Sequence, residues 1–225
     1  MTSADLHEDL LLEWQSLPHH VGKIFAQDGI IDPEYWASSP CRVLFLLKEA
    51  YFDPKKASLD VDQRWDLRRL VRDEEGEPRG NIALTEAEWA YAIHCIAERR
   101  DPRLPDRTNH AELRKALLSS AIVNVKKSDG KRHSDDDDIA WYAREDGPLL
   151  RQQVDNIAPD VIICGKVWEH VKFLWKPSKL DLDAVWREGY CTIVDYWHPA
   201  NQFPRLLNYY TLVYLLTRAG VYRHS

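Results

Sequence analysis

The sequence lacks the features of a membrane span, a secretion signal and a cysteine-rich metal centre. No uninterrupted apolar run approaches the ~20 residues that a membrane-spanning helix needs. The stretch MTSADLHEDLLLEW carries acidic side chains where a signal peptide carries basic ones, and it offers no small-residue cleavage site. The four cysteines are scattered, without the close pairs of zinc knuckles, iron–sulfur clusters or redox motifs. We therefore expect a cytoplasmic protein without a membrane segment, a metal or a cofactor.

The sequence also lacks an excess of positive charge. A formal net charge of −6 argues against a surface coated with basic residues, and so against non-specific binding to nucleic acid. One local basic patch remains, KKSDGKRH at 126–133, and the acidic run SDDDD follows it. Four consecutive carboxylates lack the spacing of a cation-binding loop, so we expect a solvated loop there. His19 and His20 are expected to lie at the surface.

The chain does have enough apolar residues for a two-sided core. Its 225 residues, 44% of them hydrophobic, predict a single domain over 1–225. The segment 53–84 is rich in charge and contains DEEGEPRG, which indicates a charged surface insertion with one short helix around DQRWDLRRLV. No internal repeat or linker divides the chain.

Four short apolar, β-branched segments predict buried strands: CRVLFLL (41–47), SAIVNV (120–125), DVIICG (160–165) and CTIVDY (191–196). Their continuous apolar character is typical of strands buried on both faces of a parallel sheet. Helical patterns lie between or after them, at 85–100, 147–160 and 204–220. The first opens with the capping-box spacing Thr85 to Glu88, and the last starts at a proline and ends at a glycine. The sequence thus predicts an α/β fold with three layers, α/β/α, and a central, mostly parallel four-stranded sheet.

Polar residues follow each predicted strand. They occupy 48–53, 124–127, 165–166 and 198–205. In a parallel sheet the ligand lies beyond the carboxyl ends of the strands. We therefore expect these four segments to meet at one edge of the sheet and to form the functional site.

The segments VLFLLKEAYFD, AIVNVKK, LLRQQVDNIAPDVIICG and WHPAN, in this order, resemble the uracil-DNA glycosylase superfamily over roughly residues 41–215. Members of that family carry a catalytic polar or acidic residue after the first strand, an Asn at the end of the second and an HPS-like motif after the fourth. The resemblance implies a monomeric DNA glycosylase that flips a uracil-like or modified pyrimidine out of DNA and hydrolyses its N-glycosidic bond. This chain departs from the family in lacking a glycine before Glu49 and in placing Ala200 where the motif has serine.

The chemistry assigns roles to particular residues. Breaking an N-glycosidic bond leaves positive charge on the sugar and negative charge on the base, so the site needs a carboxylate near the sugar and a donor near the base. Glu49 is the candidate carboxylate, with Asp53 as its rival, and His198 is the candidate donor. Asn124 offers the donor and acceptor that read a pyrimidine edge.

Further residues are predicted to hold the substrate. Tyr51 or Phe52 would stack on the flipped base, and Asn201 is a second substrate-binding amide. The predicted phosphate contacts are Lys126, Lys127, Lys131 and Arg205, and Phe203 or Arg205 would fill the space that the flipped base leaves.

Three alternatives remain open. The base could be uracil or a hypermodified base of viral DNA, in which case the role would be antiviral defence rather than repair. The chain could keep the fold as a module that binds nucleic acid or a nucleotide without cleaving it. It could also be a hydrolase or phosphoesterase of another substrate class, which the acidic balance favours.

Overall fold

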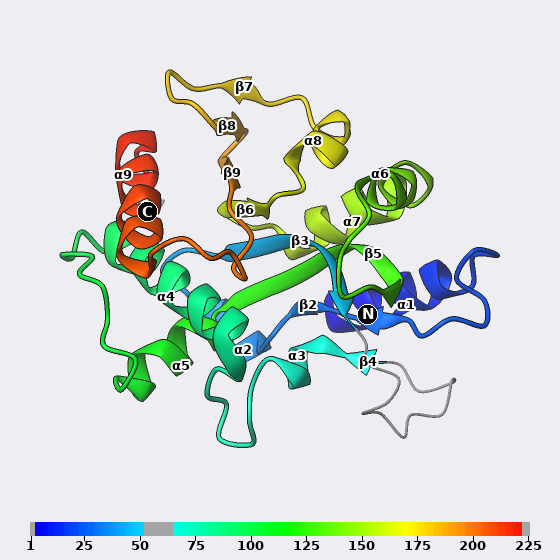
Figure 1. Ribbon diagram of the computed structural model, residues 1–225, viewed down its shortest axis with the longest axis horizontal. Coiled ribbons are helices and arrows are strands. Elements are labelled where there is room, and N and C mark those ends of the chain that lie inside the picture. The colour runs from blue at the N-terminus through cyan, green and yellow to red at the C-terminus, as the bar shows by residue number, and fades with distance from the viewer. Residues whose placement is uncertain (1–2, 52–64, 222–225) are drawn as a thin grey trace.

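The computed structural model describes residues 3–51 and 65–221, which form a seven-stranded sheet with helices packed on its faces (Figure 1). The strand order is β2-β5-β3-β6-β9-β8-β7. The strands are β2 (Gly29–Ile30), β3 (Val43–Tyr51), β5 (Ser120–Gly130), β6 (Val161–Gly165), β7 (Ser178–Lys179), β8 (Val185–Glu188) and β9 (Cys191–Tyr196). A separate two-stranded sheet pairs β1 (Ala26–Gln27) with β4 (Trp65–Asp66). The α/β class is therefore present, with seven strands in the main sheet where the sequence predicted four.

The difference in strand number lies at the edges of the sheet. The central strands β5, β3, β6 and β9 run parallel, and they coincide with the four apolar segments of the sequence. β2, β8 and β7 pair antiparallel to their neighbours. These edge strands have only two to four residues, which is too short for an apolar run to reveal them.

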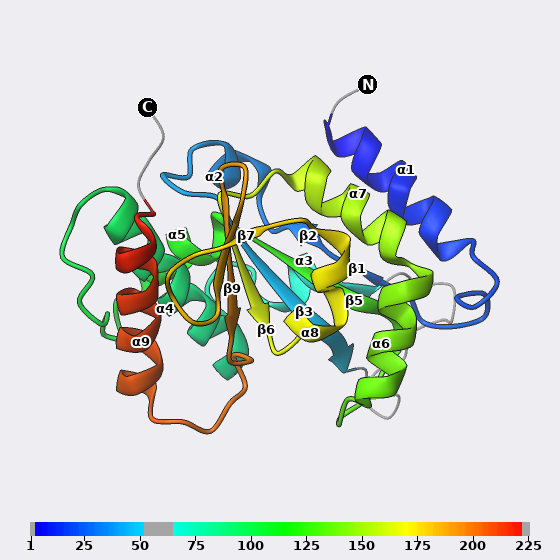
Figure 2. The same cartoon turned by 90° about the horizontal axis from the view of Figure 1, so that it is seen from above.

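Helices cover both faces of the sheet, as Figure 2 shows from above. One face packs against α4 (Gly80–Ala97), α5 (His110–Leu118) and α9 (Arg205–Ala219), and the other against α1 (Ser3–Gln15), α6 (Asp136–Glu145), α7 (Gly147–Ile157) and α8 (Trp168–Val171). Successive side chains of β3 point to opposite faces of the sheet. Phe45 and Leu47 therefore enter the first core, and Leu44 and Leu46 enter the second. Short turns of helix, α2 (Pro33–Ala37), α3 (Leu67–Leu70) and η1 (Lys172–Leu174), complete the elements.

The described part of the predicted insertion at 53–84 begins with strand β4 and contains α3 and the first turn of α4. Residues 52–64 lie outside the described residues, α3 provides the expected short helix, and α4 begins at Gly80. Thr85 therefore lies inside α4, where its hydroxyl donates to the carbonyl of Asn81 at 2.8 Å instead of capping a helix start. Among the described helices, none is both long enough and apolar enough to cross a bilayer.

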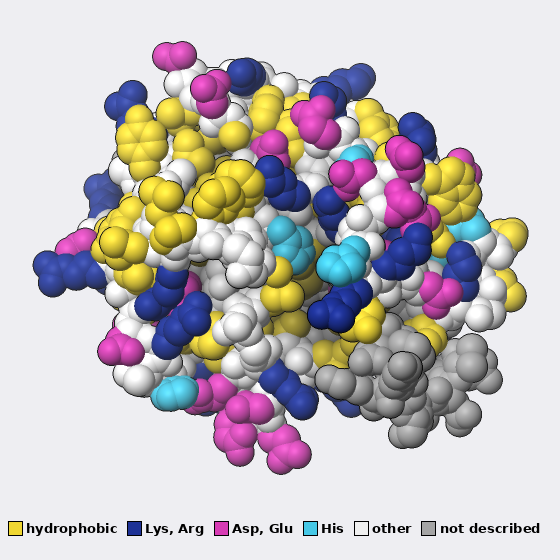
Figure 3. Space-filling view, viewed as in Figure 1, with side chains coloured by type: hydrophobic (Ala, Val, Ile, Leu, Met, Phe, Trp, Pro, Cys, Tyr) yellow, Lys and Arg dark blue, Asp and Glu magenta, His cyan; other side chains and the backbone are white. Residues whose placement is uncertain are grey.

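The connections place a topological switch point at the middle of the sheet. The chain passes from β3 to β5 through α4 and α5 on one face, and from β5 to β6 through α6 and α7 on the other. After the neighbouring strands β3 and β6 the chain thus continues to opposite faces of the sheet. In open α/β sheets, ligands bind beside the carboxyl ends of two such strands. Figure 3 looks at this edge, and histidine side chains lie near its middle with Lys and Arg side chains beside them.

Candidate active site

Glu49 occupies the carboxyl end of β3, opposite Lys126 of β5. Its side chain is 1% exposed, and its Oε2 lies 3.1 Å from the Lys126 Nζ. Neither carboxylate oxygen has a hydrogen-bond partner among the described residues. The group is therefore a buried carboxylate whose neighbouring ammonium, that of Lys126, it shares with Asp138.

Lys126 links this carboxylate to α6. Its Nζ donates to Asp138 Oδ2 at 2.7 Å and lies 5.2 Å from the centre of the Tyr142 ring. Burial by itself would lower the pKa of Lys126, but the hydrogen bond that it donates to Asp138 and the charge of Glu49 raise it above its usual value. The ammonium stays charged and turned inward, so it supports the carboxylate and is not available as the predicted phosphate contact.

His198 follows β9 on the adjoining part of the same edge. Burial, with a smaller contribution from the positive charge of Lys48, lowers its pKa to about 4, so the ring is neutral at pH 7. Its Nδ1 accepts the backbone N–H of Ala200 at 3.1 Å. In the neutral ring the proton must then reside on Nε2, which makes Nε2–H a hydrogen-bond donor.

Close packing at the end of β6 brings His198 to the switch point. A Cβ placed on Gly165 would lie 3.5 Å from the Cα of His198 and 2.6 Å from Cδ2 of Leu47. Only a residue without a side chain lets these two neighbours approach β6 so closely. Glu49, two residues beyond Leu47, therefore reaches the same edge of the sheet as His198.

Asn124 joins them from β5. It lies directly opposite Leu47 in the parallel register, which places it one pleat before Glu49 on the same side of the sheet. Asp28 fixes its position, because Asp28 Oδ2 accepts the backbone N–H of Asn124 at 2.7 Å and its Nδ2 at 3.4 Å. The structure thus brings Glu49, Asn124 and His198 to one edge although they are widely separated in the sequence.

Lys127 corrects the sequence prediction of a phosphate contact. Its side chain has no exposed surface, and its Nζ contacts both oxygens of Asp28 at 2.6 and 2.7 Å and Oε1 of Gln153 at 2.9 Å. Burial lowers its pKa, against the opposing charge of Asp28. An ammonium enclosed in this way cannot reach DNA.

Other cations do line the edge. Lys48 Nζ lies 2.5 Å from Asp136, which also lies 3.6 Å from Nε2 of His170. Lys166 is exposed, and its Nζ stands 3.9 Å from the centre of the Trp197 ring. Lys131, a predicted phosphate contact, is half exposed and pairs with Asp138 at 3.0 Å. The acidic run therefore begins α6 and pairs with lysines, where the sequence predicted a solvated loop.

The loop after β9 and helix α4 enclose a polar pocket of about 220 Å³. Glu88, buried in α4, accepts Nε of Arg107 at 2.7 Å and Nε of Arg205 at 2.8 Å. Both guanidinium groups remain more than one-third exposed, and with one carboxylate between them the pair carries a net positive charge. Arg205 thus keeps the surface access that a phosphate contact requires.

Asn201 holds this loop together. Its Nδ2 donates to the carbonyl of His198 at 2.8 Å, and its Oδ1 accepts from Phe203 N at 3.0 Å and Asn208 Nδ2 at 2.6 Å. These bonds engage the amide within the loop, so Asn201 positions His198 and is not free to bind substrate as predicted. Phe203 remains exposed and packs against Trp197, with ring centres 4.4 Å apart.

The predicted stacking residues lie at the boundary of the described chain. Tyr51 ends β3 and is 47% exposed, so its ring is open to a partner. Phe52 and Asp53 lie outside the described residues, and their predicted roles stay predictions.

Glu86 is a residue that sequence reasoning missed. It is fully buried in α4, one turn before Trp89, whose ring contacts Tyr196 at the end of β9. Burial raises its pKa to about 8, and neither carboxyl oxygen has a hydrogen-bond partner among the residues described. The signal in the sequence was a single carboxyl on an otherwise apolar helix face, between Ala83 and Ala90.

No model of a protein family matches this sequence, and no curated protein sequence matches it either.

Proposed function

We propose that this chain is a DNA glycosylase that flips a uracil-like or modified pyrimidine out of DNA and hydrolyses its N-glycosidic bond. The observation that supports this most is that the buried Glu49 carboxylate and the neutral His198 donor both lie at the carboxyl edge of the sheet. Glycosidic cleavage needs this combination of a negative group near the sugar and a neutral hydrogen-bond donor near the leaving base.

In the proposed reaction the bond between C1′ and the base nitrogen breaks, and its electron pair leaves with the base. The Glu49 carboxylate stabilises the positive charge that develops on the sugar. Nε2–H of His198 donates to the base as it becomes anionic. Water then adds to C1′, and the proton that it loses neutralises the departed base anion, which yields an abasic site and the free base.

Asn124 is proposed to read the base. Asp28 occupies one hydrogen of its Nδ2, which leaves the second hydrogen and the Oδ1 acceptor for a pyrimidine edge. Because the same carboxylate also holds the backbone N–H, the amide is oriented before the base arrives. Tyr51, exposed at the end of β3, is the candidate stacking ring.

DNA backbone contacts are assigned to the exposed and partly exposed cations around the edge. Lys166, Lys131, Arg107 and Arg205 are the candidates. They replace Lys126 and Lys127, which are committed to buried carboxylates. Positive side chains on one rim attract DNA locally even where the whole chain is acidic.

A second candidate function is a nucleotide- or nucleic-acid-binding module without catalysis. The observation in its favour is that the Glu49 carboxylate is 1% exposed and already paired with Lys126 at 3.1 Å. A group closed in this way would support binding at the edge while remaining inaccessible to a sugar.

The test is incubation of the protein with duplex and single-stranded oligonucleotides carrying uracil and other modified pyrimidines, and with hypermodified phage DNAs. Alkaline cleavage then reports abasic sites.

We expect cleavage of at least one substrate. We expect Glu49→Gln to slow the single-turnover rate on that substrate by on the order of 10²-fold or more, the scale of a missing preorganised electrostatic partner. Glu145→Gln, at an exposed glutamate of α6, is the matched control and should retain the rate. Binding without cleavage of any substrate would favour the second candidate.

A further inference from the structure

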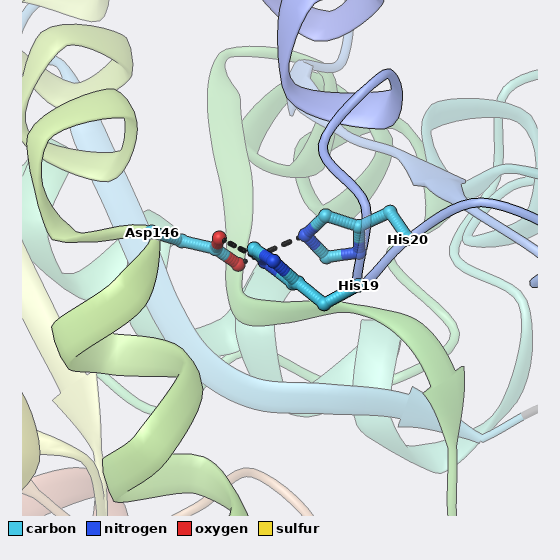
Figure 4. A group of neighbouring side chains, drawn as sticks. All are labelled: His19, His20 and Asp146. Carbon is cyan, nitrogen blue, oxygen red and sulfur yellow. Dashed lines mark hydrogen bonds and ion pairs between the residues drawn. The ribbon is translucent and has the colours of Figure 1, made fainter.

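Two adjacent histidines and one aspartate form a buried cluster on the α6–α7 side of the molecule (Figure 4). His19 and His20 lie in the connection between α1 and β1, and Asp146 lies at the junction of α6 and α7. The side chains of His20 and Asp146 have no exposed surface, and that of His19 is 22% exposed. The sequence prediction that both histidines lie at the surface is therefore wrong for His20.

The ligating atoms of the three side chains point toward one another. Nε2 of His19 lies 2.7 Å from Oδ1 of Asp146, and Nε2 of His20 lies 3.0 Å from Oδ2. One ligand atom from each residue fits within a 4.8 Å span. Around a tetrahedral zinc ion, with bonds near 2.1 Å, neighbouring ligand atoms lie roughly 3.3 Å apart. Small side-chain movements would therefore let all three groups bind one ion.

A second layer of contacts holds the His20 ring in place. Its Nδ1 lies 2.5 Å from the hydroxyl of Ser128, near the end of β5, and its ring contacts the rings of Phe25 and Tyr142. Trp141 and His19 make an edge-to-face contact, with ring centres 5.1 Å apart. A hydrogen bond from the second ring nitrogen is the usual device that orients a metal-binding histidine.

Buried charge near the cluster is unbalanced. Asp146 and Asp28 contribute two carboxylates, and Lys127, paired with Asp28, contributes one ammonium. A cation bound at the cluster would offset the second of these carboxylates.

We infer that His19, His20 and Asp146 bind one divalent transition-metal ion of the Zn²⁺ class. Two imidazole nitrogens and one carboxylate oxygen suit such ions, whereas Mg²⁺ and Ca²⁺ prefer oxygen ligands alone. The partly exposed side of His19 leaves room for water as a further ligand. The site would tie the α1–β1 connection to the α6–α7 junction, and it is independent of the glycosylase proposal.

The test is titration of the full chain, freed of metal by a chelator, with Zn²⁺ alone by calorimetry and with Co²⁺ by visible absorption. We expect one saturable equivalent. Zn²⁺ at a hundredfold excess over its Kd should raise Tm by roughly 5–10 °C for a chain of this size. His19→Ala and Asp146→Asn should each weaken zinc binding by on the order of 100-fold or more.

His133→Ala, which removes an exposed histidine outside the cluster, is the matched control and should bind zinc as the unmodified chain does. His19→Ala carries little folding risk because that ring is partly exposed. Should Asp146→Asn fail to fold, His19→Ala and the unmodified chain still decide the question. Absence of saturable binding in the unmodified chain, or equal affinity in His19→Ala, would overturn the inference and leave the cluster as a hydrogen-bonded network.

Discussion

Glu86 illustrates how burial sets the protonation of a single residue. Its pKa rises from 4.5 to about 8 through desolvation alone, so at pH 7 the folded protein holds a proton that the unfolded chain has released. A raised pKa contributes stability that is fully present below pH 4.5 and is lost as the pH rises through 8. At ~1.4 kcal/mol per pKa unit, the loss is on the order of 5 kcal/mol at most.

We therefore expect Glu86→Gln to gain stability relative to the unmodified chain as the pH increases from 4.5 toward 8. Glutamine has the same shape and no proton to lose, so its own desolvation cost does not vary with pH. Urea unfolding of both proteins at several pH values measures the difference in free energy. Glu145→Gln, at an exposed carboxylate, should show a constant difference. If the difference in unfolding free energy between Glu86→Gln and the unmodified chain does not vary with pH either, Glu86 is not protonated in the folded protein at pH 7.

The location of a candidate residue could be predicted where its position relative to a strand decides it. Glu49, Asn124 and His198 follow or end apolar strand segments, and parallel strands bring such positions to one edge. Whether a side chain is exposed and free to bind a ligand could not be predicted in this way. Lys127 looked like a surface lysine because its partner Asp28 is 99 residues away, and nothing local in the sequence announces that pair.

Elements with a strong local signal matched the sequence prediction closely. The predicted helix at 204–220 is α9 (Arg205–Ala219), with Pro204 before it and Gly220 in the left-handed conformation at its end. β5 is longer than the predicted segment 120–125 and continues to Gly130. Residues 126–128 of this extension are polar yet buried, because side chains of other elements bind them, and an apolar pattern does not extend into such a segment.

The end of β6 offers a test at the scale of the element. Gly165→Ala should destabilise the fold by roughly 1–3 kcal/mol, because the new Cβ would lie 2.6 Å from Cδ2 of Leu47. Gly165 has no positive φ, so the effect comes from steric crowding and not from backbone strain. Urea unfolding of Gly165→Ala, Leu47→Ala and the double variant separates the effect of crowding between the two side chains from the effect of each substitution alone. The double variant should be more stable than the sum of the single changes by about 0.5–3 kcal/mol, whereas additivity would exclude crowding against Leu47 as the cause.

At the scale of the whole molecule, an acidic chain presents cations on one edge. The net charge is −6, yet Lys166 is exposed, and Arg107 and Arg205 are partly exposed, beside the carboxyl ends of the strands. Three buried carboxylates fix the positions of basic groups: Asp28 binds Lys127, Glu49 binds Lys126, and Glu88 binds the two arginines. DNA affinity would then depend on a few placed cations and not on overall charge.

These cations predict a specific salt dependence. Binding of a uracil-containing duplex oligonucleotide to the Glu49→Gln variant, which limits turnover, should weaken as salt rises, because each neutralised phosphate releases a counterion. Adding Lys166→Ala should reduce the slope of log affinity against log salt by about 0.9, the value for one neutralised phosphate on duplex DNA. Lys179→Ala, at an exposed lysine on the edge strand β7, should leave the slope unchanged. Fluorescence anisotropy over a range of salt concentrations gives both slopes. An affinity that does not vary with salt, or equal slopes with and without Lys166, would mean that DNA phosphates do not lie on this edge and that the ligand is small or uncharged.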